Sequence, residues 1–435
     1  MNIAVAITAL FSGMFIVVMG GLADRVGRVR IMMLGFVLSI VGALLIALAP
    51  KGDLAIPFLM VGRAIQGISA ACIMPASLAL VKTYWQGAER QRAVSMWSIG
   101  SWGGSGLCAM FGGLVSQNFG WRWIFFACAA VSLVGMLMVR GTPESKVRST
   151  GSHKLDIPGI LSFMVAMVAL QIVVTQGNKF GWTSPLVLLM VAVTFVAGGL
   201  FFWFEARAEN SFVDFKLFNN PIFTGATISN FMLNGVAGML IVSLQLLQLG
   251  GGLSAQQAGM LTLGYAIAII AFIRVGEKLL QRFGSRKPMI WGCLITGVSI
   301  ILLMPANLML DDYKIMSIIA YTLFGIGLAF YATPSTDAAL SNLPADQAGS
   351  GAGIYKMASS LGGAFGVAIS AAIFTALRMD NSSVQWMEGL INFAGRQDNV
   401  ATREAAIIAL LFNLVMVVFA VISIMFTIPK GKKNA

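Results

Sequence analysis

Long apolar runs alternate with short polar segments along almost the whole chain. Each run reaches or approaches the roughly 20 residues that an α-helix needs to cross the hydrocarbon core of a bilayer. Helical runs of this kind predict thirteen membrane-spanning helices. In chain order they cover residues 3–21, 31–49, 54–82, 91–115, 121–139, 157–176, 185–204, 221–248, 255–273, 288–304, 315–337, 349–377 and 405–428.

The composition supports an all-α integral membrane protein. Hydrophobic residues make up 58% of the chain and charged residues 11%, whereas soluble domains average about 45–50% and about 25%. The net charge of +12 would suggest a nucleic-acid partner for a soluble protein. In a multi-pass protein it reflects the enrichment of Lys and Arg in cytoplasmic loops, so we expect a lipid bilayer and no nucleic acid as partner.

The distribution of positive residues predicts the orientation. Loops on the same side as residues 22–30 hold twenty Lys and Arg residues, and loops on the other side hold six. By the positive-inside rule the richer side is cytoplasmic. We therefore expect a multi-pass protein of the cell membrane with Met1 outside and the C-terminus in the cytoplasm.

The residue types that build enzyme and metal sites are scarce. The only histidine, His153, lies in a basic loop, so a histidine-centred catalytic or metal site is not expected. The four cysteines lie inside apolar runs without paired spacing, which predicts small core residues and no disulfides; they are Cys72, Cys108, Cys128 and Cys293. We expect no enzyme activity, no metal and no cofactor.

Three pairs of similar segments recur at nearly equal offsets. Gly27 in DRVGRVR corresponds to Gly284 in QRFGSRK, Pro75 to Pro334, and residues 100–104 to residues 362–366. The offsets of 257, 259 and 262 residues predict two related halves. The predicted domains are an N-terminal half at 1–140, an inserted helix pair with its linkers at 141–220, and a C-terminal half at 221–435. The counterpart of helix 221–248 would precede Met1, so we expect the repeat to lack its first helix.

Two motifs resemble those of the major facilitator superfamily. The first is G-x-x-x-D-R-x-G-R, here Gly20, Asp24, Arg25, Gly27 and Arg28, which we call the latch motif. The second is R-x-x-Q-G, here Arg63, Gln66 and Gly67. Residues 120–126 (GWRWIFF), residues 155–159 (LDIPG) and the inserted pair resemble the fourteen-helix drug:proton antiporters, and among these the quinolone efflux pumps. The resemblance implies the major facilitator fold, here with about thirteen helices, the first of the fourteen being absent.

The same resemblance implies a multidrug efflux transporter. It would export amphiphilic drugs such as quinolones, cationic dyes and biocides by proton-coupled alternating access, with the proton gradient as energy source and the chain as a monomer. An exporter of an endogenous metabolite or lipid, and a truncated remnant that inserts without transporting, remain alternatives. No G-x-x-x-x-G-K-[ST] loop is present, so direct use of ATP is not expected.

The latch motif suggests a cytoplasmic clamp. Its glycines let backbones turn and approach, and Asp24 can face the positive N-terminus of a helix. In the family this helix belongs to the other half, which here would be the one that begins near Ser350, where Gly349, Gly351 and Gly353 leave N–H groups accessible. A purely topogenic basic loop would explain the arginines, although it would not explain the spacing of Gly and Asp.

Charged residues within apolar runs are candidates for proton coupling. Arg63 lies deep in its predicted helix, where an arginine costs a few kcal/mol to insert, and the resemblance implies a role for it and Gln66 in proton coupling or in the cavity. A structural arginine bound to carbonyl groups is the alternative. The candidate carboxylates Asp24, Glu277 and Asp337 all lie toward predicted cytoplasmic ends.

Polar residues on one face of helix 221–248 predict a substrate cavity. Such a stripe would be costly against lipid, and tyrosines of the helix 315–337 could join it. The predicted set is Asn230, Asn234, Gln245, Tyr321 and Tyr331. The family's antiporter signature in helix 91–115 is incomplete, because Cys108 and Ala109 replace its Gly-Pro. Antiport is therefore less firmly predicted than transport.

Overall fold

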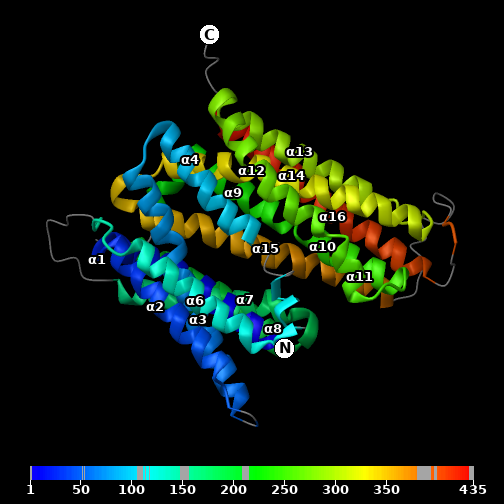
Figure 1. The fold of residues 1–435 in the computed structure, drawn as a ribbon, viewed down its shortest axis with the longest axis horizontal. Helices are drawn as coiled ribbons and strands as arrows, with labels where there is room; N and C mark the ends of the chain where they lie inside the picture. Colours follow the sequence, from blue (N-terminus) through cyan, green and yellow to red (C-terminus); the bar gives the residue numbers. More distant parts are fainter. Residues whose placement is uncertain are drawn as a thin grey trace. The chain divides into compact units, whose positions relative to one another are not determined.

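The computed structural model describes residues 2–50, 52, 54–104, 111–112, 114–116, 118–146, 156–207, 215–379, 393–395 and 399–430. Most of these residues lie in helices (Figure 1). Among them, twelve helical stretches are long and apolar enough to cross a membrane. This confirms the predicted all-helical membrane architecture. The remaining predicted span, 91–115, begins as α4 (Gly87–Ser98) and η1 (Ile99–Gly103), and part of it lies outside the described residues.

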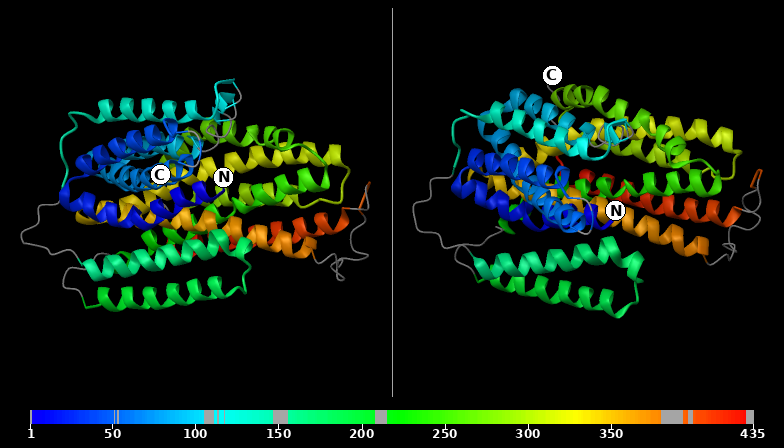
Figure 2. Two further views of the ribbon diagram at one scale, coloured as in Figure 1. Left: turned by 90° about the horizontal axis from the view of Figure 1, so that it is seen from below. Right: turned by 60° about the horizontal axis from the view of Figure 1, so that its bottom comes forward.

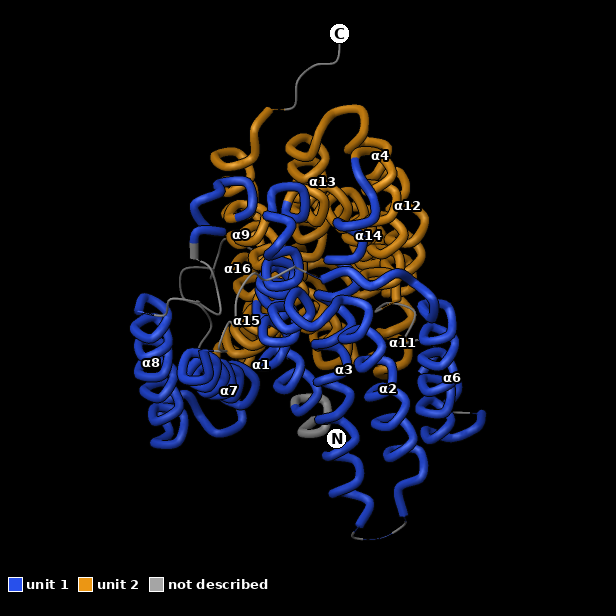
Figure 3. Tube along the Cα trace, turned by 90° about the vertical axis from the view of Figure 1, so that its left-hand side faces the viewer, with its two compact units in different colours: residues 1–86, 108–223, 339–361 blue, residues 87–107, 224–338, 362–435 orange. Residues whose placement is uncertain are grey.

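The chain divides into two compact units, shown in blue and orange in Figure 3. Unit 1 comprises residues 1–86, 108–223 and 339–361. It thus includes the beginning of a helix from the C-terminal part of the chain. Its elements are α1 (Asn2–Val26), α2 (Arg28–Ala47), α3 (Ala55–Tyr84), α6 (Arg122–Val139), α7 (Ile157–Phe180), α8 (Pro185–Glu205), the 3₁₀ helices η2 (Phe215–Asn219) and η4 (Ala345–Gln347), and the first part of α15 (Ala348–Met379).

Small and branched side chains hold α2 and α6 together in unit 1. Ala43, Ile46 and Ala47 of α2 form a buried cluster with Phe125 and Ala129 of α6. Small residues let membrane helices approach closely, so that dispersion contacts replace the hydrophobic effect that is absent between helices in lipid.

The inserted pair, α7 and α8, forms an antiparallel hairpin in unit 1 (Figure 2). Each helix begins with a side-chain cap followed by proline, a combination that favours helix starts. The Asp156 carboxylate accepts from Gly159 N at 3.0 Å, and the Ser184 hydroxyl accepts from Val187 N at 3.3 Å. Phe195, 77% exposed, illustrates the outer face of the pair, which suits contact with lipid.

Unit 2 comprises residues 87–107, 224–338 and 362–435. Its helices include the long membrane-crossing stretches of the C-terminal part of the chain. Its elements are α4, η1, α9 (Pro221–Gly235), α10 (Gly238–Gln245), η3 (Leu246–Gly250), α11 (Ala255–Met260), α12 (Leu263–Phe283), α13 (Arg286–Leu303), α14 (Leu310–Ser341), the rest of α15, and α16 (Val400–Thr427).

The predicted continuous helix 221–248 is interrupted, which corrects the sequence prediction. It consists of α9, α10 and η3, with Val236 and Ala237 between the first two. At the break the backbone forms tighter bonds, from Ala237 N to Asn234 O and from Met239 N to Val236 O. Here α9 lies against α15 so closely that a Cβ on Gly366 would overlap the carbonyl of Gly235. The packing of these glycines determines the path of the helix.

The cysteines are only partly as predicted. Cys72 and Cys293 are buried, whereas Cys128 is exposed on α6, and Cys108 lies outside the described residues. The exposure of Cys128 contradicts its predicted place in a core. The reason is that α6 presents an apolar outer face, on which Val131 is 72% exposed, and a thiol is apolar enough for such a face.

Candidate functional site

The latch motif forms a sharp corner between two helices, and not the longer loop that was predicted. Gly27 is the single residue between α1 and α2, and its φ of 136° is one that residues with a side chain rarely adopt. A Cβ at this position would also lie 2.6 Å from the carboxyl carbon of Glu144. The corner therefore requires glycine, and it brings Asp24 and Arg28 together on adjacent helix ends.

Asp24 binds both a cation and a helix N-terminus. Its Oδ1 accepts from Arg28 Nε at 2.9 Å and from Arg28 Nη2 at 2.8 Å. The carboxylate also accepts from Gly349 N at 2.9 Å and from Ser350 N at 3.0 Å. These N–H groups belong to the first turn of α15, where intrahelical partners are lacking. The contact expected between Asp24 and this helix, which we call the latch contact, is present in unit 1.

Arg28 is 3% exposed and joins four segments of unit 1. Its Nη1 donates to the hydroxyls of Thr83 at 2.5 Å and Ser145 at 3.1 Å, and its Nη2 donates to the carbonyl of Ala345 at 2.8 Å. A buried guanidinium is tolerated when a carboxylate and further acceptors surround it. Arg25, also in the latch motif, is exposed.

Glu144 caps the start of α2, a role that the sequence analysis missed. Its Oε1 accepts from Val29 N at 3.0 Å and its Oε2 from Arg30 N at 3.1 Å. A carboxylate at this place satisfies N–H groups that a helix start leaves without partners. An acidic residue more than one hundred positions away carries no local sequence signal for capping.

Glycines bring α1 and α15 into backbone contact beside the latch contact. A Cβ on Gly20 would overlap the carbonyl oxygen of Gly349, and one on Gly353 would lie 2.9 Å from the carbonyl oxygen of Ile16. Nearby, Lys82 Nζ donates to the carbonyl of Leu340 at 2.5 Å. The Gly spacing of the latch motif therefore serves a close approach.

The other two candidate carboxylates lie in unit 2, and each pairs with an arginine. Arg90 Nε donates to Asp337 Oδ1 at 2.9 Å, and Gln91 donates to Asp337 Oδ2 at 3.4 Å. This pair joins α4 to α14. Glu277 forms an ion pair with Arg274 within α12. Both carboxylates are 4% exposed, so their charges depend on these partners.

Arg63 lies among α1, α3 and α6 in unit 1. Its guanidinium carbon is 5.0 Å from the centre of the Phe125 ring, a cation–π contact, and its Nη1 donates to Gln66 Oε1 at 3.4 Å. Its buried Nε has no hydrogen-bond partner in the described part of the chain. Gly67, from the same motif, lets α3 approach the carbonyl oxygen of Thr8, which lies 2.6 Å from where a Cβ would be.

The predicted substrate residues lie within the packing of unit 2. Asn234 Nδ2 donates to the carbonyl and side-chain oxygens of Asn230 at 2.7 and 2.8 Å. The buried hydroxyls of Tyr321 and Tyr331 bind Ser243 and Ser229, each at 2.7 Å. Gln245, at the end of α10, is half-buried. The structure thus gives the two tyrosines hydrogen-bonded places in the core, and their predicted role toward a substrate stays a prediction.

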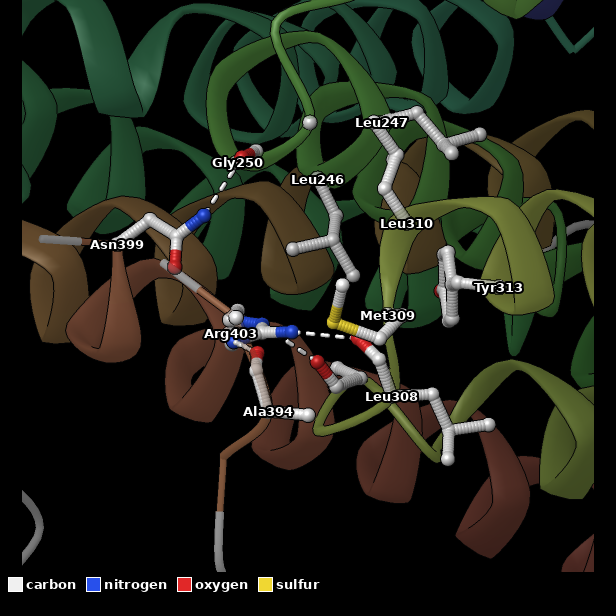
Figure 4. Close-up of a pocket in the computed structure, with 13 residues that line it drawn as sticks. Leu246, Leu247, Gly250, Leu308, Met309, Leu310, Tyr313, Ala394, Asn399 and Arg403 are labelled. Atoms are coloured by element: carbon white, nitrogen blue, oxygen red, sulfur yellow. Dashed lines mark hydrogen bonds between the residues drawn. The ribbon is translucent and has the colours of Figure 1, made fainter. Parts of the chain in front are cut away.

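Unit 2 also has a cavity of about 170 Å³, and none of the predicted substrate residues lines it (Figure 4). Arg403 closes it by donating to three loop carbonyls, those of Ala306, Ala394 and Leu308, at 2.6, 2.8 and 2.6 Å. Asn399 Nδ2 donates to the carbonyl of Gly250 at 2.6 Å. These hydrogen bonds hold the start of α16 against Gly250, at the end of η3, and against the loop that contains Ala306 and Leu308. They indicate a structural role for Arg403 and Asn399.

Comparisons with known proteins give a consistent result. The profile of the Major Facilitator Superfamily matches residues 1–367 and 223–433. The quinolone resistance protein NorB of Staphylococcus aureus strain MRSA252 is 46% identical over 430 residues, 99% of this chain and 88% of that protein. The structure of the proton:xylose symporter XylE superposes with a TM-score of 0.63 at 16% identity, over 98% of this chain and 86% of that one. The human organic anion transporter MFSD10 gives 0.63 at 14% identity, over 97% and 83%.

Proposed function

The chain belongs to the Major Facilitator Superfamily, and on this premise we propose that it is a multidrug efflux transporter. It exports amphiphilic drugs, quinolones among them, by alternating access. The observation that carries the proposal is the 46% identity to the quinolone resistance protein NorB across 99% of this chain. The chain is a multi-pass membrane protein, and its positive residues favour a cytoplasmic C-terminus, which a reporter fused after residue 435 would test.

The latch contact supplies the reversible lock that alternating access requires. Asp24 comes from the predicted N-terminal half, and Gly349 and Ser350 come from the predicted C-terminal half. The contact consists of hydrogen bonds to one carboxylate, so it can break without unfolding a core. We assign it the role of closing the cytoplasmic side while the transporter is open to the outside.

Proton coupling, the proposed energy source, has specific candidates. Asp24, Glu277 and Asp337 are each buried and paired with an arginine. Protonation would remove the negative charge and weaken the ion pair. Binding of a proton at Asp24 would therefore weaken the latch contact directly, which couples proton uptake to opening. Arg63, whose buried Nε–H has no hydrogen-bond partner in the described part of the chain, is the candidate for donating a hydrogen bond to the substrate or to a group that takes part in proton coupling.

The test is norfloxacin efflux from energised cells that express this chain, with and without a protonophore. Membrane insertion is first checked by the fluorescence of a C-terminal fusion. We expect efflux that the protonophore abolishes, and the same behaviour for ethidium as a second, cationic substrate. Correctly inserted protein that exports neither compound would contradict the proposal, and efflux that survives the protonophore would contradict proton coupling alone.

A further inference from the structure

Unit 1 contains an apolar cavity of about 530 Å³ between the inserted pair and the rest of the unit. It lies among α1, α7, α8, η2 and the first part of α15, and ligand pockets span about 300–1,000 Å³. Aromatic and aliphatic side chains form its walls. Representative lining residues are Val17, Phe163, Met167, Phe201, Phe218 and Ile354.

The walls suit a hydrocarbon better than a drug with several polar groups. Thr194 is the lining residue with a hydroxyl, and that hydroxyl already donates to the carbonyl of Met190 at 2.8 Å. A buried polar group without a partner is unfavourable. A polar or charged ligand would therefore lose its hydration in this cavity, whereas an acyl chain has no such loss.

A polar pocket of about 210 Å³ adjoins the same short helix. Lys216, Asn220, Asn342 and Gln347 line it, and Asn220 Nδ2 donates to the carbonyl of Asn342 at 3.4 Å. The helix η2 thus contributes Lys216 to the polar pocket and Phe218 to the apolar cavity. With a rise of about 2.0 Å per residue in a 3₁₀ helix, these two positions are roughly 4 Å apart along its axis.

The apolar cavity has a wall on a face of unit 1 that a bilayer would cover. Phe202, one of its lining residues, is 58% exposed. Leu161 and Val165 on α7 and Leu188 on α8 are also exposed. Because exposed apolar residues of a membrane protein meet hydrocarbon, the surrounding lipid has direct access to this part of the inserted pair.

We propose that the two pockets bind one anionic phospholipid. An acyl chain fills the apolar cavity, and the phosphate accepts hydrogen bonds from the Lys216 ammonium and from the side-chain amides beside it. A lysine attracts anionic headgroups electrostatically, and a charged donor strengthens the bond to a phosphate oxygen. This proposal goes beyond drug export and does not depend on it, since it requires only the membrane placement of the chain.

Two neighbouring glycines provide a matched test. Gly198 lines the apolar cavity, whereas Gly199 is not among its lining residues. A Cβ at either position would meet nothing within 4 Å. Gly198→Phe should therefore fill the cavity without a clash at its base, while Gly199→Phe adds the same ring elsewhere on α8.

The experiment uses the full chain in vesicles of phosphatidylcholine that contain phosphatidylglycerol with a diazirine on its acyl chain. After illumination, the labelled peptides are identified by mass spectrometry. We expect labels concentrated on the lining residues of α7 and α8. Labelling there should fall about tenfold in Gly198→Phe, because a filled cavity excludes the chain, and should stay unchanged in Gly199→Phe. Ala166→Leu, at a second lining position, repeats the test if Gly198→Phe does not fold.

Evenly spread labels, or labels that persist in both Gly198→Phe and Ala166→Leu, would overturn the proposal. The headgroup is tested with the same probe built on phosphatidylcholine. Phosphatidylglycerol should label about fivefold better, the ratio that corresponds to about 1 kcal/mol per lysine near an anionic surface, and Lys216→Gln should remove this preference. Equal labelling of the native chain by both lipids would overturn the proposal that the site prefers an anionic headgroup. Drug transport is not measured, so a failure here is separate from a failure of the proposed function.

Discussion

Replacing Asp24 by asparagine should release the latch contact while preserving the shape of the side chain. The carboxylate accepts from Arg28 and from the N–H groups of Gly349 and Ser350. The pair with Arg28 lies within the α1–α2 corner and does not require α15. Only the bonds to Gly349 and Ser350, and the bond from Arg28 to Ala345, are lost when α15 and the preceding helix η4 move away.

The size of the effect follows from these bonds. Hydrogen bonds to a charged group contribute about 1.5–3 kcal/mol each, so the two from α15 supply about 3–6 kcal/mol. The single amide oxygen of asparagine can still accept a neutral bond worth about 1 kcal/mol. We expect the engaged state to lose about 2–5 kcal/mol, which changes the ratio of engaged to released molecules roughly thirty-fold to several thousand-fold.

The assay is the distance between spin labels at Val26 and Asp346, both exposed and both in unit 1, in a cysteine-free background. Asp24→Asn should populate a longer distance that is rare in the parent protein. Arg25→Gln is the control, because it removes an exposed neighbouring charge and should change the distribution little. A distribution that Asp24→Asn leaves unchanged would refute the assignment of Asp24 to the latch, as would an equal shift in both variants.

Three further predictions concern stability and substrate. In a double-mutant cycle, Arg90→Gln and Asp337→Asn should couple by about 1–2 kcal/mol in unfolding free energy, because they share a mostly buried ion pair; additive effects would contradict the pair. Gly27→Ala should lower the free energy of unfolding by about 1–3 kcal/mol, because alanine is strained at the positive φ of this position. Gly100→Ala should leave it unchanged, because a Cβ there would meet nothing within 4 Å. Thermal unfolding of the two variants tests this difference. Tyr321→Phe should lower the free energy of unfolding by about 1–2 kcal/mol through its lost buried bond; a raised KM for norfloxacin would support its predicted place in the substrate cavity, and an unchanged KM would contradict it.

The apolar pattern predicts the helices well because membrane spanning constrains length and composition together. The ends of α3, predicted at 54 and 82 and found at 55 and 84, illustrate this. The interruption at Val236 was not predictable, since the glycines on either side acquire their role only through packing against other helices. Period and hydropathy along one segment contain no information about its neighbours.

The charged residues also divide into those whose role the local sequence indicates and those whose partner depends on the fold. Asp24 could be assigned to a helix start because helix electrostatics favours such a contact and the family resemblance implies which helix it meets. Arg90 was counted only as a positive loop residue, although it pairs with Asp337 across 247 positions. Local sequence shows that a carboxylate such as Asp337 is unusual in an apolar run, while its partner emerges only from the fold.

The helix α15 contributes residues to both units. It runs without interruption from Ala348 to Met379, and its sequence contains no proline, in contrast to α14, which has Pro334. The N–H of Gly349 donates to the Asp24 carboxylate, and Gly362 packs against the Phe231 backbone of α9. These two glycines are 13 residues apart, about 20 Å along a helix. The helix α15 therefore carries both Gly349, which the latch contact uses, and Gly362, which packs against α9 near Asn230 and Asn234, two of the residues predicted for the substrate cavity.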